Sequence, residues 1–307
     1  MSLSDTKSFH PSVPPAQPKT DRRFSVRSYG LTDVGRVRPA NEDQFVIVEL
    51  ARTMSVRQTS VPQAKAQYSS HRGHLFLVAD GVGGHEAGEV ASALSVVSVE
   101  GFLLNTLKRF FHMEAPEEQH VLKEFQAALL QADARIFEEA SRHPEMTGMG
   151  TTLTLAFAVD WRLLIAHAGD TRCYLLSGGE LHQLTDDHTK VAEMVRHGIL
   201  SPEQASRHPS RHVITNVLGG NEPGVHVEMH KLDLEAGDVL LLCSDGLTEM
   251  VPDARIAAIL QEEREPQRAC ERLVAEANAL GGKDNITVLV ACFEAAASSA
   301  PTKGDQS

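Results

Sequence analysis

Six acidic side chains stand where apolar segments of the sequence stop or where a turn begins. These residues are Glu42, Asp43, Asp80, Asp170, Asp245 and Asp284. Three of them follow an apolar run and small residues and precede a small residue, in "LVADGVGG", "IAHAGDTR" and "LLLCSDGL". One such aspartate is typical of a turn or a helix cap. Their recurrence indicates a shared site, because carboxylates gathered at one rim repel one another unless a cation neutralises them.

The types of these ligands predict the metal and the chemistry. Oxygen donors without His or Cys partners favour Mg²⁺ or Mn²⁺ over zinc. A glycine directly after Asp80 leaves the Gly81 carbonyl open as a further ligand. Two such ions would hold the attacking and leaving oxygens of a phosphoryl displacement. Arg38 could offer a bidentate fork to the phosphate, although an isolated arginine is more often a solvated surface residue.

The glycine-rich stretch "HLFLVADGVGGHEAGEVAS" allows two interpretations. Its glycines could cradle a nucleotide phosphate, or they could let the Asp80 carboxylate and the Gly81 carbonyl close on a metal ion. The stretch lacks the G-x-x-x-x-G-K-[ST] lysine and hydroxyl of a nucleotide loop, and it is not G-x-G-x-x-G. We therefore favour the metal interpretation.

Composition limits the class of protein. The chain has 307 residues, 42% of them hydrophobic, and a formal net charge of −12. Nucleic acids and anionic membranes need a basic surface, so neither is expected as a partner. The four cysteines are widely spread without a CxxC pair, which argues against disulfides or zinc and favours a reducing cytoplasm. We expect no signal peptide and no membrane-spanning segment.

The order of elements predicts an α+β fold. Residues 44–50 and 74–80 read as strands, and a polar insertion between them, about residues 51–73, reads as a surface loop. Apolar spacing predicts helices over 86–111 and 117–142, followed by a meander of antiparallel strands. Two more helices near 253–263 and 266–280 precede a last strand at 285–293. Grouped strands and helices favour α+β over a doubly wound parallel sheet.

Several motifs in this order resemble one known family. The segments "RVRPANEDQF", "LVADGVGGHEAGEVAS", "MGTTLTLAFA", "AHAGDTRCYLL", "LTDDHT", "CSDGLTEMV" and "GGKDNITVLV" are similar to those of the metal-dependent serine/threonine protein phosphatases, the PP2C or PPM family, in its bacterial branch. The resemblance covers about residues 25–294. It implies a four-layer α-β-β-α sandwich of two antiparallel sheets flanked by helices. Residues 1–24 and 295–307 are expected to be disordered arms.

The resemblance also implies roles for matching residues. Asp80 would bridge two Mn²⁺ or Mg²⁺ ions with help from the Gly81 carbonyl. Asp245 would bind the first ion, and Asp43 and Asp284 the second. In the same family pattern, Asp170 would hold a third, weaker ion with Asp245, Glu42 would lie behind the ligands, and Arg38 would bind phosphate.

Other positions are less distinctive. Residues 186–212 resemble the flap beside the active site, which varies between members and affects substrate choice; we call them the flap. His85 could act as a general acid or simply begin a helix. The other histidines show no metal spacing and are interpreted as solvated or flap residues, with no catalytic role assigned to His212. Asp33 is expected in a turn.

These features predict a protein phosphatase that hydrolyses phosphoserine and phosphothreonine by direct attack of a metal-activated water. No cysteine lies in a C-x5-R phosphate loop, which argues against a cysteine nucleophile. We expect a cytoplasmic monomer whose partners are phosphorylated proteins, either Ser/Thr kinases or the substrates of such kinases. The alternatives are an inactive phosphatase fold used as a binding module, and a phosphatase dedicated to one regulator such as an anti-sigma-factor antagonist.

Overall fold

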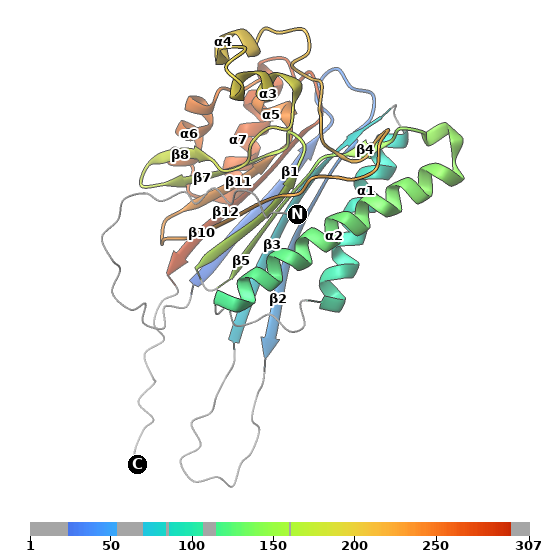
Figure 1. Cartoon of the computed structure of the whole chain (residues 1–307). Helices are drawn as coiled ribbons and strands as arrows, with labels where there is room; N and C mark the ends of the chain where they lie inside the picture. Colours follow the sequence, from blue (N-terminus) through green and yellow to red (C-terminus); the bar gives the residue numbers. More distant parts are fainter. Residues whose placement is uncertain (1–23, 54–69, 84–85, 107–114, 160, 296–307) are drawn as a thin grey trace, which may run out of the picture.

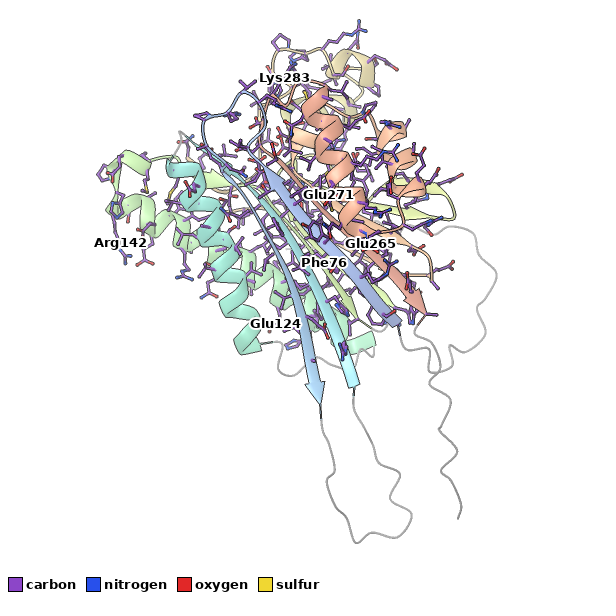
Figure 2. The ribbon with its side chains drawn as sticks, turned by 180° about the vertical axis from the view of Figure 1, so that it is seen from behind. Phe76, Glu124, Arg142, Glu265, Glu271 and Lys283 are labelled. Carbon is purple, nitrogen blue, oxygen red and sulfur yellow. The ribbon has the colours of Figure 1, made fainter. Side chains whose placement is uncertain are left out.

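Two antiparallel sheets lie face to face, and helices cover the outer face of each (Figure 1). The computed structural model describes residues 24–53, 70–83, 86–106, 115–159 and 161–295. Helices α1 and α2 lie on one side of the pair of sheets and α6 and α7 on the other, as the view from behind also shows (Figure 2). The predicted four-layer α+β sandwich is therefore confirmed.

The strands divide into two sheets with antiparallel neighbours. The first has the order β1-β12-β11-β7-β8, and the second has the order β10-β6-β5-β3-β4-β9, with β2 paired to β3. The strands are β1 (Phe24–Asp33), β2 (Asp43–Thr53), β3 (Ser70–Val82), β4 (Gly150–Thr151), β5 (Leu153–Val159), β6 (Arg162–Ala168), β7 (Arg172–Ser177), β8 (Glu180–Gln183), β9 (Leu218–Gly219), β10 (Glu228–Asp233), β11 (Val239–Cys243) and β12 (Ile286–Ala295).

The long helices pack their apolar faces against the sheets, and the short helices α3 and α4 lie within the flap. The α-helices are α1 (Glu86–Thr106), α2 (Ala115–Arg142), α3 (Lys190–Arg196), α4 (Pro202–Ala205), α5 (Asp245–Thr248), α6 (Asp253–Glu262) and α7 (Pro266–Ala279), and a 3₁₀ turn spans Pro144–Met146. No helix in the described part of the chain combines the length and the apolarity that crossing a membrane requires.

Strand β3 shows why the sandwich has separate cores. Its side chains alternate between the two faces of the sheet. Leu75 and Leu77 join the core beneath α1 and α2, whereas Phe76 and Val78 join the core between the sheets. All four are fully buried. A strand covered on both faces therefore reads as a continuous apolar run rather than an alternating one.

The structure corrects the bounds of the predicted insertion and of the predicted arms. Residues 51–73 are not all loop: β2 continues through Thr53 and β3 begins at Ser70, with Ala51 paired to Arg72. The assigned arms include Phe24 and Ala295, which lie in β1 and β12; residues 1–23 and 296–307 lie outside the described residues. The first long helix is described only to Thr106. The helices predicted near 253–263 and 266–280 are confirmed as α6 and α7.

Candidate metal centre

The five predicted aspartates come from five places in the sequence. Asp43 is the first residue of β2, Asp80 lies near the end of β3, Asp170 follows β6, Asp245 begins α5 and Asp284 shortly precedes β12. Helix α5 lies beside α3 at one end of the sandwich (Figure 1). The turns that end these elements bring the carboxylates to that end.

Register places the first two carboxylates together. Asp43 and Asp80 are direct partners in the antiparallel β2–β3 pair. Two like charges directly opposite each other in a sheet destabilise the pairing. The pairing of Asp43 with Asp80 is thus unfavourable unless a proton or a cation neutralises one of the two carboxylates.

Burial and mutual repulsion favour the neutral form of these carboxyl groups. Burial raises the pKa of Asp43 to about 6, although hydroxyl hydrogen bonds oppose the shift. Burial and the charges of Asp43 and Asp245 raise the pKa of Asp80 well above its ordinary value. Burial, with the charge of Asp187, raises the pKa of Asp170 to about 7. For Asp245, burial and the charge of Asp170 again raise the pKa strongly.

Two carboxylate oxygens at this site fit a bound cation. Among the described residues, Oδ1 of Asp43 and Oδ1 of Asp245 are buried and have no hydrogen-bond partner. Burying an unsatisfied carboxylate oxygen is costly, and a divalent ion satisfies it without a donor. With only oxygen donors in the predicted set, the residues fit Mn²⁺ or Mg²⁺.

Hydroxyl groups fix the positions of the paired aspartates. Ser244 Oγ lies 2.7 Å from Asp43 Oδ2 and donates to it. The backbone N–H of Asp80 donates to Thr152 Oγ1 at 3.1 Å, and the hydroxyl of Thr151 donates to the Asp80 carbonyl at 2.9 Å. Ser244, Thr151 and Thr152 were not among the predicted site residues. They lie in the "MGTT" and "CSD" motifs, and their contacts with Asp43 and Asp80 form only in the folded chain.

Two glycines allow the backbones around the site to approach closely. A Cβ atom at Gly81 would lie 2.3 Å from the Gly88 carbonyl oxygen, and one at Gly246 would lie 1.9 Å from the Asn285 carbonyl oxygen. Any side chain at either position would displace main chain. The glycines after Asp80 and Asp245 are therefore steric requirements of the site.

Arg38 and Glu42 lie at the same end. Nη2 of Arg38 is 2.5 Å from Asp284 Oδ2, and the guanidinium is half exposed. The Glu42 carbonyl accepts from Gly81 N–H at 3.2 Å, and its own N–H donates to Asn285 Oδ1 at 2.9 Å. Glu42 is thus tied through its backbone to the glycine and asparagine that adjoin the predicted ligands.

Tight groups of three possible ligand atoms are found at two places in the described residues. One is His212, Asp245 and Glu249, and the other is His167, His188 and Glu228; in each group the atoms lie within 4.8 Å of one another. Of the predicted aspartates, only Asp245 belongs to such a group. Ligands divided between two ions about 3.5–4 Å apart need not form a single tight group.

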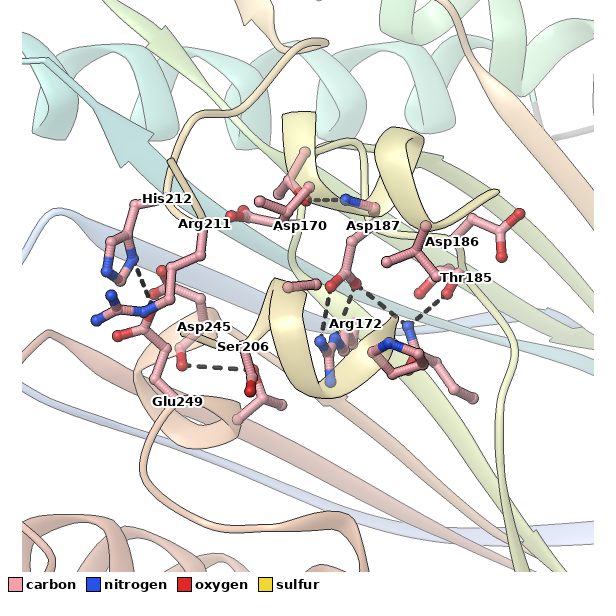
Figure 3. A pocket seen from close by; sticks show the side chains of 18 of the residues that line it. Asp170, Arg172, Thr185, Asp186, Asp187, Ser206, Arg211, His212, Asp245 and Glu249 are labelled. Atoms are coloured by element: carbon pink, nitrogen blue, oxygen red, sulfur yellow. Dashed lines mark hydrogen bonds and ion pairs between the residues drawn. The ribbon is translucent and has the colours of Figure 1, made fainter. Parts of the chain in front are cut away.

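A groove of about 680 Å³ opens between the flap and the body of the protein (Figure 3). Asp170 and Asp245 line it, and the flap contributes His212, which pairs with Glu249 at 2.6 Å. At the other side of the groove Arg172 binds both oxygens of Asp187, at 2.8 and 2.6 Å (Figure 3). The groove gives an extended ligand access to two of the predicted aspartates.

The histidine predictions have mixed outcomes. His85 lies outside the described residues. The interpretation of the remaining histidines as solvated or flap residues is wrong for His167, which is fully buried on β6, and for His74, which is buried on β3. The partners of His167 come from distant segments, so sequence spacing gives no sign of them. Asp33, which was expected in a turn, is instead the last residue of β1 and pairs with Ile286; its Oδ1 accepts from Gly35 N–H at 2.8 Å at the start of the following turn.

Comparison with known proteins finds matches in sequence and in fold that cover most of the chain. A family model described as Protein phosphatase 2C matches residues 55–277. The serine/threonine phosphatase stp of Listeria innocua is 35% identical over 259 residues, which are 84% of this chain and 92% of that protein. The crystal structure of the Mycobacterium tuberculosis serine/threonine phosphatase PstP/Ppp aligns with a TM-score of 0.71 and 34% identity, over 88% of this chain and 99% of that one. The catalytic domain of PstP in complex with two manganese ions aligns with a TM-score of 0.70 and 33% identity, over 89% of this chain and all of that one.

Proposed function

This chain belongs to the protein phosphatase 2C family, and from that premise we propose that its aspartate cluster is the binuclear centre of a serine/threonine protein phosphatase. The enzyme is metal-dependent and hydrolyses phosphoserine and phosphothreonine in phosphorylated proteins. One observation carries the assignment to this site. Two buried, unpartnered carboxylate oxygens, of Asp43 and Asp245, lie among further carboxyl groups whose pKa values are raised.

The proposed ligands divide between the ions as follows. Asp80 and the Gly81 carbonyl bind at the centre, Asp245 holds one ion, and Asp43 and Asp284 hold the other. Asp170 shares a third, weaker ion with Asp245. When bound, the ions would lower the pKa of a water and withdraw charge from the phosphoryl oxygens.

The chain's own residues hold and orient the phosphate. In this proposal Arg38 supplies the bidentate fork, because its exposed guanidinium already reaches the carboxylate of Asp284. Glu42 supports the ligands from behind through its bonds to Gly81 and Asn285. Because the donors are fixed by backbone and hydroxyl contacts, little reorganisation accompanies binding.

Two finer features belong to the proposal. The partners are Ser/Thr protein kinases or their substrates, and the flap beside the groove contributes to the choice among them. The enzyme acts in the cytoplasm as a monomer. A binding module without activity would not need the retained carboxylates, so the phosphatase function is favoured over it.

The test is phosphate release from a phosphothreonine peptide by the purified chain, with Mn²⁺ added in steps and then removed by EDTA. Saturable release that EDTA abolishes and Mn²⁺ restores is the expected result. A folded protein that releases no phosphate at any Mn²⁺ or Mg²⁺ concentration contradicts the proposal and favours the binding module. A matched phosphotyrosine peptide tests the preference for Ser/Thr.

A further inference from the structure

A second polar cluster lies at the base of the flap. It consists of His167 on β6, His188 at the start of the flap and Glu228 on β10. The two imidazole rings are 4.9 Å apart, and both are buried. Such a cluster either binds a metal or forms a hydrogen-bond network, and the positions of the ring protons distinguish the two.

The proton positions of His188 follow from its neighbours. Gly169 N–H lies 3.1 Å from His188 Nδ1, and the amide nitrogen of Asn216 lies 2.9 Å from the same atom. The Asn216 amide is oriented by two bonds to the His226 backbone, so its nitrogen faces the ring. Nδ1 therefore accepts and Nε2 carries the proton, which it donates to Glu228 Oε2 at 3.0 Å.

His167 is fixed in the same way. Its Nε2 lies 3.2 Å from the Asp186 carbonyl, so Nε2 carries the proton, and Nδ1 accepts from Thr154 Oγ1 at 2.8 Å. Burial and the neighbouring His188 lower the pKa of His167 to about 4. All four ring nitrogens of the two histidines already have a hydrogen-bond partner in the chain, so neither ring offers a free lone pair to a metal. The cluster is therefore a hydrogen-bond network.

Glu228 holds this arrangement in place. Its carboxylate accepts from His188, from His230 and from the backbone N–H of Asp186 at 3.2 Å. Burial raises its pKa, but the hydrogen bonds from His188 and His230 outweigh that effect, and the net shift is downward. An ionised carboxylate at Nε2 keeps the His188 lone pair at Nδ1.

The backbone of His188 extends the network to the rest of the flap. Its N–H donates to the Gly169 carbonyl at 2.7 Å, and its carbonyl accepts from Thr215 N–H at 2.8 Å. Thr215 follows the last flap residue by three positions, and Gly169 directly precedes Asp170. One residue thus joins the start of the flap, the segment after it and the Asp170 turn.

We propose that His188 is a positioning residue that holds the Gly169–Asp170 turn against the base of the flap through its Nδ1 acceptor. The role sets the Mn²⁺ affinity of the site to which Asp170 contributes, and His188 itself touches neither metal nor substrate. The inference rests on the proposed function only in taking Asp170 as a metal ligand.

Two substitutions separate the ring nitrogens. His188→Asn places an oxygen acceptor near the Nδ1 position, whereas His188→Gln places an amide donor near the Nε2 position and leaves Gly169 N–H without its side-chain acceptor. Mn²⁺ alone is titrated by calorimetry into the full chain. We expect His188→Gln to weaken the weakest Mn²⁺ site by about tenfold or more. His188→Asn should stay within about threefold of wild type, because it keeps the bond to Gly169.

A histidine outside the network provides the control for these two variants. His197→Asn removes an exposed ring in the flap and should match wild type, because His197 lies at the end of α3, outside the network. Equal losses in His188→Asn and His188→Gln, or no loss in either, overturn the proposal. If neither variant folds, Glu228→Gln decides: a folded variant with unchanged Mn²⁺ affinity overturns it.

Hydrolysis of p-nitrophenyl phosphate by the same variants supplies an independent measurement. We expect the Mn²⁺ concentration for half-maximal activity to rise in His188→Gln, with kcat at saturating Mn²⁺ largely retained. A loss of kcat that saturating Mn²⁺ does not restore contradicts a positioning role. Wild-type protein that binds Mn²⁺ but hydrolyses nothing contradicts the proposed function, while the calorimetric comparison still tests His188.

Discussion

The Ser244 hydroxyl donates to Asp43 Oδ2 at 2.7 Å, and Ser244 Oγ in turn accepts from Thr287 N–H at 3.0 Å. Ser244 is fully buried, so its hydroxyl is shielded from bulk solvent. Because Ser244 Oγ accepts the Thr287 N–H, its own proton is left to point at the Asp43 carboxylate. The residue that follows β11 of the first sheet thus orients a predicted ligand on β2 of the second sheet.

Ser244→Ala should weaken Mn²⁺ binding by about tenfold, as expected when a group that orients a metal ligand is removed. It should also cost about 1 kcal/mol of unfolding free energy through the lost hydrogen bond. Calorimetry with Mn²⁺ and urea unfolding measure the two effects. Ser141→Ala, which removes an exposed hydroxyl on α2, is the matched control. Unchanged Mn²⁺ affinity in Ser244→Ala would show that Asp43 needs no such support.

Asp80→Asn should reduce turnover of a phosphothreonine peptide by about 100-fold or more, because a ligand contributes at least as much as the groups that orient it. The protein should stay folded, because the amide fills the same space and repels its acidic neighbours less. Steady-state kinetics and circular dichroism check the two statements. Near wild-type turnover would exclude Asp80 as a shared ligand.

Arg38→Lys should raise KM for the phosphopeptide about tenfold, because lysine keeps the charge but loses the planar fork. Competitive inhibition by inorganic phosphate should weaken in parallel. Arg36→Lys, a neighbouring exposed arginine without a proposed role, is the control. If phosphate inhibition is identical in the two variants, Arg38 does not bind phosphate.

Mn²⁺ binding should strengthen as pH rises. The pKa values of Asp43 and Asp170 are raised to about 6 and about 7, so protons compete with the metal below those values. In the metal-free protein, a raised carboxyl pKa stabilises the fold at low pH, and this contribution is lost as pH rises through 6 to 7. The Tm increase caused by Mn²⁺ should therefore be larger at pH 8 than at pH 5.5, as differential scanning fluorimetry can test. An equal increase at both pH values would contradict these shifts.

The effect of His167 on the pH dependence of the unfolding free energy should be opposite in sign to that of the buried carboxyl groups. Its pKa is lowered from 6.5 to about 4, so the stability it contributes is present above pH 6.5 and is lost as pH falls toward 4. His167→Gln keeps a donor for the Asp186 carbonyl but cannot be protonated. In EDTA, the wild-type unfolding free energy should fall more steeply than that of His167→Gln between pH 6.5 and 4. Parallel curves would mean that His167 does not remain neutral.

Sequence patterns predicted the elements that are long and strongly periodic. The continuous apolar run of β3 and the spacing of α6 and α7 are examples, because local periodicity reports burial directly. Strand β1 was missed because Gly30 and polar residues interrupt its pattern, while its partner β12 lies more than 250 residues away. The flap helices α3 and α4 have seven and four residues, too few to show a helical period.

The candidate site was predictable where a residue's own neighbours in sequence carry the signal, as at Asp80 and Gly81. Supporting groups were not, because they act across the fold. Ser244 reaches Asp43 over 201 positions, and His188 meets Gly169 and Glu228 from separate segments. Their residue types are common, and only the folded chain brings them to their partners.

The β2–β3 pair has consequences for how this protein can vary in length. Its register places Asp43 opposite Asp80. The pairing continues to Thr53 and Ser70, which lie ten positions and about 33 Å further along the strands. A residue inserted within either strand would turn every following side chain to the other face. Residues added between positions 53 and 70 leave that register untouched. The far end of the ribbon is therefore a place where evolution, or an engineer attaching a second domain, can add sequence without disturbing the carboxylates.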